Sequence, residues 1–188
     1  MDLDIGGIVI STNYPWYEIV ENTDEIEQGD VLRSWPVIIP DEWIGGVGEV
    51  DTYIDEYNMI IMSQSCDIKN NKIDNVLACP LLILDEMEKY TSRGDRNKLK
   101  KGEIIGYHLL NKCELEELPA CGLSELAGKY LVVDFRNAYS IPLKFLLDGI
   151  DAQRDKRLRL LPPYKEHLSQ AFARFIMRVG LPVEIQDF

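Results

Sequence analysis

The sequence predicts a β-rich α+β fold, arranged as a single domain over residues 1–188. Three observations support it. Most apolar residues occur in short runs rich in Val and Ile, and residues that favour turns separate these runs. One segment near the C-terminus has the periodicity of an amphipathic helix, over about residues 164–179. The composition, 46% hydrophobic and 28% charged in 188 residues, is ordinary for one folded domain.

The first predicted strands lie in the N-terminal third of the chain. They are GGIVIST, GDVLRSW (which should end at Pro36) and VIIP. The next segment, DEWIGGVGEVDTY, holds three glycines and four acids, so we expect a long acidic loop. Its GGVG lacks the lysine of a phosphate-binding loop.

Further strands are expected in the middle of the chain. MIIMSQ and NVLACPLLIL should form an antiparallel pair, joined by the polar segment DIKNNKID. The highly charged residues 84–101 predict a helix broken near Gly94, and residues 113–129 an irregular or partly helical connection. Three other segments are predicted strands: GEIIGYHLL, YLVVDF and AYSIPL.

The C-terminal helix is the clearest element. Its apolar residues recur at the i, i+3, i+4, i+7 spacing of one helix face, which should pack on the barrel or sheet formed by the strands. Gly180 and Pro182 should end the helix. The apolar face consists of Leu168, Ala171, Phe172, Phe175, Ile176 and Val179.

Charge is distributed unevenly along the chain. The formal net charge is −12, and residues 1–60 hold 14 acids against one base, Arg33. Residues 144–178 hold eight bases against four acids. The overall field repels nucleic acid, which proteins bind by neutralising phosphate charge. A basic patch near the C-terminus could meet an acidic partner, through Arg154, Lys156, Arg157, Arg159, Arg174 and Arg178.

The sequence also bears on localisation. The N-terminus is acidic and lacks the basic start of a signal peptide, and no apolar run approaches the ~18 residues of a membrane-spanning helix. Four cysteines are too few for a secreted disulfide scaffold of this length. We therefore expect a cytoplasmic protein with reduced thiols.

Four segments together resemble the PemK/MazF-like toxins. GDVLRSWPVI is similar to their opening strand, MIIMSQS to the second, NVLACPLLIL to the apolar third, and YLVVDFRNAYSIPLKFL to the later strand and helix start. The resemblance covers about half of the chain. It implies a small SH3-like barrel, with strands within about residues 5–145, elaborated by insertions.

The residues with which these toxins cleave RNA have no counterpart. Their catalytic arginine corresponds to a position near Tyr57, and their threonine to a position near Leu82. A tyrosine brings no cation to the charge that develops on phosphate, and leucine cannot transfer a proton. The resemblance therefore implies the same fold with a function other than RNA cleavage.

Cys66 is the candidate for covalent chemistry. His108 lies in a predicted strand and could act as a base, with Asp134 orienting its imidazole, in a hydrolase or redox enzyme. No known local signature surrounds Cys66, and free cysteine is most often a buried residue. The spacings C-x12-C and C-x7-C match no compact zinc site, so we expect neither a metal nor a cofactor.

These observations favour a non-catalytic binding or accessory protein that docks a protein partner through its charged surfaces. The family resemblance suggests a toxin–antitoxin or phage-defence setting. Two alternatives remain: an enzyme using Cys66, and a divergent PemK-like protein acting on nucleic acid through the basic residues 154–178.

Overall fold

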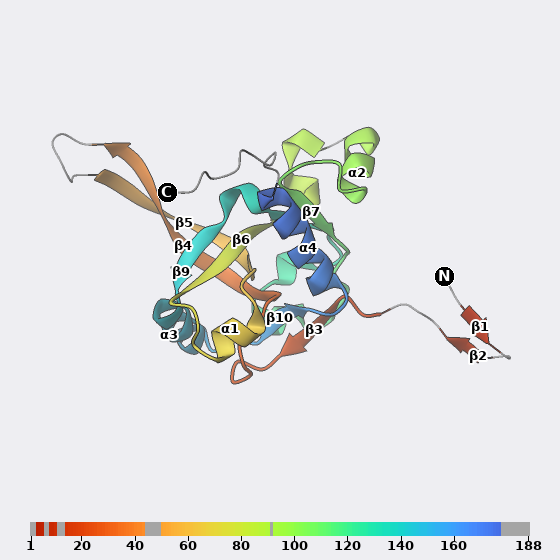
Figure 1. Cartoon of the computed structure of the whole chain (residues 1–188), viewed down its shortest axis with the longest axis horizontal. Helices are drawn as coiled ribbons and strands as arrows, with labels where there is room; N and C mark the ends of the chain where they lie inside the picture. The colour runs from red at the N-terminus through yellow and green to blue at the C-terminus, as the bar shows by residue number, and fades with distance from the viewer. Residues whose placement is uncertain (1–2, 6–7, 11–13, 44–49, 91, 178–188) are drawn as a thin grey trace, which may run out of the picture.

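The computed structural model describes residues 3–5, 8–10, 14–43, 50–90 and 92–177. Its main feature is an open sheet of eight strands, in the order β3-β10-β4-β5-β6-β8-β7, with β9 also paired to β6 (Figure 1). Every pairing between described strands is antiparallel. The α+β, β-rich class is therefore confirmed, whereas the SH3-like identity stays a prediction.

The elements have the following bounds. The strands of the main sheet are β3 (Tyr17–Val20), β4 (Asp30–Trp43), β5 (Val50–Ile61), β6 (Asn75–Ile83), β7 (Tyr107–Leu110), β8 (Leu131–Asp134), β9 (Tyr139–Pro142) and β10 (Arg157–Leu160). A separate hairpin joins β1 (Leu3–Ile5) to β2 (Ile8–Ile10). The helices are α1 (Ser65–Lys69), α2 (Arg93–Lys100), α3 (Leu143–Gln153) and α4 (Tyr164–Ile176). None of the described helices is long and apolar enough to cross a membrane.

Strand β6 organises the sheet. It pairs with β5 along one edge and with β9 and then β8 along the other. Six of its nine residues are buried, as expected of a strand with neighbours on both edges, whereas Asn75 and Leu77 near its start are exposed. The predicted antiparallel pairing of MIIMSQ with NVLACPLLIL is confirmed, and the polar connection between them contains α1.

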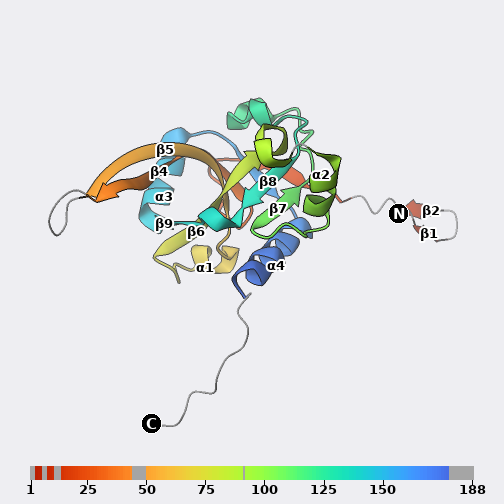
Figure 2. The same cartoon turned by 90° about the horizontal axis from the view of Figure 1, so that it is seen from above.

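The largest core cluster lies between the sheet and α4. Side chains of β3, β4, β5, β6, β7, β8 and β10 contribute to it, and α4 adds Leu168, Ala171, Phe172 and Phe175. Figure 2 shows α4 beside β7 and β8. The predicted packing of the C-terminal helix is confirmed for these four residues. Ile176 does not belong to the packed face, because it is 57% exposed at the end of α4. Val179 and Gly180 lie outside the described residues.

A second cluster buries the other side of β4, β5 and β6 under α3 and α1. Trp35 of β4 packs there edge-on against Phe145 of α3, with 5.7 Å between ring centroids. Gly149 lets α3 approach this closely, because a Cβ at that position would lie 2.4 Å from the Trp35 ring. Helix α3 therefore fits against β4 only with glycine at position 149.

Several boundaries differ from the sequence predictions. Strand β4 continues through Pro36 to Trp43, and β5 begins at Val50, so most of the predicted acidic loop is strand. Gly94 lies within α2 near its start, β7 covers only the end of GEIIGYHLL, and 3₁₀ turns occupy much of the connection at 113–129. Strands β3 and β10 and the full extent of α3 have no counterpart among the predicted elements.

A buried ionic cluster joins β10 to β4. The Asp30 side chain is fully buried and accepts hydrogen bonds from Arg157 Nε at 3.2 Å and Arg159 Nη2 at 3.0 Å. Both guanidinium groups also donate to backbone carbonyls of the loop between β3 and β4, at Asn22, Asp24 and Glu25. The cluster therefore fixes two strands and the loop beside them.

Substituting Asp30 tests the importance of this cluster. Asp30→Asn keeps the shape of the side chain but leaves two buried cations without their shared carboxylate. We expect the free energy of unfolding at pH 7 to fall by about 3–5 kcal/mol, measured by urea denaturation. The exposed pair between Lys144 and Asp148 provides a control, and Asp148→Asn should cause no measurable change. Equal stabilities of the two variants would contradict the role given to Asp30.

Candidate functional site

The most distinctive surface is a hairpin that extends away from the rest of the sheet. It consists of the outer parts of β4 and β5, residues 36–43 and 50–56, which we call the arm (Figures 1 and 2). Pairs of facing residues fix its register, among them Ile38 with Ile54 and Trp43 with Val50. A register shift between Pro40 and Trp43 marks a β-bulge, which preserves the pairing while bending the strand.

One face of the arm is apolar and exposed. Side chains directly opposite each other in an antiparallel pair lie on the same face, and alternate residues of a strand share it. Ile38 and Ile54 are each 68% exposed, and Trp43 is 72% exposed. We call this surface the apolar arm face: Pro36, Ile38, Pro40, Trp43, Val50, Thr52, Ile54 and Glu56.

The opposite face attaches the arm to the body of the protein. Val37 is buried in the cluster under α3, and the ring of Tyr57 stacks on Tyr139 with 6.3 Å between centroids. The Tyr57 hydroxyl donates to Asp55 at 2.6 Å. This bond raises the pKa of Tyr57 to about 12 and lowers the pKa of the Asp55 carboxyl below its usual value. The arm is thus held in place from one side, which leaves the apolar arm face open.

The arm carries only negative charge. Residues 36–56 contain six acids and no Lys, Arg or His. Five of them lie in described strand positions: Asp41, Glu42, Asp51 and Glu56 are exposed, and Asp55 is partly buried. The apolar arm face is therefore bordered by carboxylates.

Two prolines lie in the outer part of β4, at positions that a strand with a free edge tolerates. Pro36 and Pro40 are four residues apart, so they occupy equivalent positions along β4. A strand accepts proline where its missing N–H would face away from the neighbouring strand. Beyond Val31, β4 pairs only with β5 among the described strands, so its other edge is free. The prolines also hinder an extra strand from adding to this edge.

The structure separates the three residues proposed for covalent chemistry. Cys66 lies exposed on α1, where its thiol is 3.7 Å from Asp67. His108 faces Val133 across the β7–β8 ladder, whereas Asp134 faces Tyr107, so His108 and Asp134 point to opposite sides of the sheet. No hydrogen bond between described residues joins any two of these three side chains.

Asp134 belongs instead to a structural network. Its carboxylate accepts from Arg136 Nε at 2.9 Å and from the Asn137 amide at 3.0 Å. The Arg136 guanidinium lies 4.1 Å from the centre of the Tyr107 ring and also donates to the Tyr107 hydroxyl. The paired carboxylate raises the pKa of Arg136 above its usual range. Asp134 therefore stabilises the turn after β8.

The predicted basic patch is not one surface. Arg157 and Arg159 are 5% and 8% exposed and bind Asp30, so the prediction that they meet a partner is wrong. The reason is that residues 157–160 form a central strand. Arg154 is exposed after α3, Lys156 pairs with Glu21 at 2.5 Å, and Arg174 is exposed on α4. Arg178 lies outside the described residues.

Sequence reasoning missed the apolar arm face because the acids of DEWIGGVGEVDTY indicated a loop. A signal was nonetheless present: Val50, Thr52 and Ile54 alternate with Asp51, Tyr53 and Asp55, and the glycines between the two halves fit a hairpin turn.

No protein-family model, curated protein or solved structure matches this chain. The resemblance to PemK/MazF-like toxins therefore stays a prediction. The site has to be interpreted from its own residues.

Thiol labelling tests the positions of the cysteines. Cys79, Cys113 and Cys121 are at most 1% exposed, and burial raises their pKa, to about 12 for Cys79 and about 11 for Cys121. We expect an aromatic disulfide reagent to label one thiol of the folded protein quickly, and all four only in urea. Cys66→Ala should remove the fast phase.

The same measurement addresses catalysis. If Cys66 is an ordinary surface thiol, it labels no faster in the folded protein than in the unfolded chain. Faster labelling in the folded protein would instead support the hypothesis of a reactive thiolate.

Proposed function

We propose that this protein is a non-catalytic binding or accessory protein that docks a basic protein partner through the apolar arm face. The observation that carries the proposal is the exposure of Ile38, Trp43 and Ile54 on one face of a hairpin. These side chains contribute little to folding while they face water. Contiguous exposed apolar surface bordered by polar groups is typical of interaction sites, and tryptophan is enriched among residues that dominate binding energy.

The charge of the arm indicates which class of partner it could bind. Six acids without a compensating base favour a protein surface in which Lys or Arg surrounds an apolar centre. The same charge opposes two other occupants, because nucleic acid and anionic lipid headgroups are both negatively charged. Symmetric pairing of two arms is also disfavoured, since it would bring carboxylates of one copy against those of the other.

The geometry suits a docking element. The arm is anchored through Val37 and Tyr57, so binding does not require it to fold. A preformed surface loses less conformational entropy on association than a disordered segment does. On the strand resemblance alone, the proposal extends to a partner in a toxin–antitoxin or phage-defence setting.

Photo-crosslinking from the arm tests the proposal. A photoreactive amino acid at Thr52, which lies on the apolar arm face, is introduced into the full chain in its native host. We expect a crosslink to a protein of net positive charge. Binding of that purified protein should weaken at least tenfold with Ile38→Thr/Ile54→Thr and should weaken with added salt.

A matched control and three outcomes make the test decisive. Ile176 is also exposed but lies on α4, so Ile176→Thr should leave binding unchanged. Three results would each overturn the proposal: no crosslink at Thr52, crosslinks only between copies of this chain, or equal loss of binding in the arm and α4 variants.

A further inference from the structure

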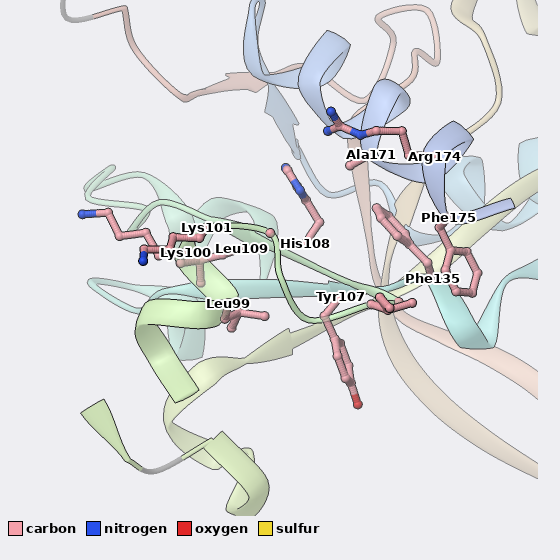
Figure 3. Close-up of a pocket in the computed structure, with 13 residues that line it drawn as sticks. Leu99, Lys100, Lys101, Tyr107, His108, Leu109, Phe135, Ala171, Arg174 and Phe175 are labelled. Carbon is pink, nitrogen blue, oxygen red and sulfur yellow. The ribbon is translucent and has the colours of Figure 1, made fainter. Parts of the chain in front are cut away.

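A cleft far from the arm separates α4 from the segment that joins α2 to β7. Its volume is about 280 Å³. Figure 3 shows Arg174 of α4 on one side, Lys100 and Lys101 at the end of α2 on the other, and His108 of β7 between them.

The rim of this cleft is positively charged in a chain whose net charge is −12. Among the described residues that line it, three are permanent cations and none is a carboxylate. Within the described part of the chain, neither Lys100 nor Arg174 forms an ion pair, and Lys101 reaches Glu103 only at 3.9 Å. These cations are therefore available to a ligand.

The floor of the cleft is apolar and aromatic. Phe135 follows β8, Phe175 comes from α4, and their ring centroids are 6.0 Å apart. The His108 imidazole lies nearly parallel to the Phe135 ring, at 6.2 Å. Leu99, Ile105, Leu109 and Ala171 add to the apolar lining. Rings of this kind favour a flat apolar ligand group.

His108 supplies a polar group within the cleft. Burial, together with the neighbouring His167 and Arg174 of α4, lowers its pKa to about 4. The imidazole is thus neutral at pH 7 and can donate one hydrogen bond and accept one. Lys100 and Lys101 at the end of α2 also line the cleft, and Figure 3 shows their ammonium groups directed outward from it. An anion placed among these groups would favour the protonated imidazole.

We propose that this cleft binds a small aromatic anion, with its ring on the aromatic side of the cleft beside Phe175 and its oxyanion held by Arg174 and His108. The size of the cleft, near the lower end of ligand pockets, suits a single ring. The oxyanion is a carboxylate or a phosphate, since both match a guanidinium group. This site is independent of the apolar arm face and does not depend on the proposed docking function.

The test uses four small probes and the NMR signals of the two histidines. Benzoate and phenyl phosphate carry both a ring and an anion, inorganic phosphate carries only the anion, and phenol only the ring. We expect at least one of the two aromatic anions to shift the His108 imidazole signals saturably and to raise its pKa towards 6.5. The tighter of the two identifies the oxyanion. Inorganic phosphate and phenol should bind at least tenfold more weakly.

Charge-reversal variants distinguish the cleft from general attraction. Arg174→Glu should weaken binding at least tenfold. Lys144→Glu makes the same change in charge on exposed α3, so it should weaken binding less than twofold. The proposal is overturned if neither aromatic anion shifts His108, if inorganic phosphate or phenol binds equally well, or if the two variants behave alike.

Discussion

The position of β10 between β3 and β4 depends on one buried carboxylate. Asp30 accepts hydrogen bonds from both Arg157 and Arg159, and these arginines in turn donate to carbonyl groups within residues 22–25. Burying three charges is costly, and the net gain from such a cluster is small. Its importance lies in specificity, because any arrangement that separates these groups would leave a charge buried alone. Since Asp30 is also the first residue of β4, the cluster fixes the strand from which the arm extends.

The arm and the body of the sheet differ in how much of their faces is covered. In the body, β4 and β5 are covered on both faces, and Met59, Ile60 and Ile61 are completely buried. In the arm, only the inner part of the face that carries Val37 and Ile39 is covered, and Tyr53 on the same face is 50% exposed. The carboxylates and prolines of the arm keep it soluble and discourage strand addition. The fold is therefore stabilised without the apolar arm face. The cleft lined by Arg174, Lys100 and Lys101 gives the chain a second surface, of opposite charge. Its elements α2 and α4 lie away from the arm in Figure 1.

The parts of the fold that were predictable are those with a local pattern. The period of residues 164–176 indicated a helix, and two apolar runs around a polar segment indicated the β5–β6 pair. The arginines of β10 were assigned to a surface patch because bases outnumber acids in residues 144–178, and nothing local reveals Asp30 over a hundred residues away. The same limit applied to His108 and Asp134. Both were placed near strands correctly, but only the register shows that they face opposite sides.

The central claim is that the apolar arm face serves binding rather than folding. It can be tested without knowing the partner, by measuring the free energy of unfolding of Ile38→Thr/Ile54→Thr against the unmodified protein. Threonine keeps the β-branched shape that strands favour. The account predicts a change of less than about 1 kcal/mol, as for surface positions. A loss of about 3 kcal/mol or more, as in a packed core, would contradict it.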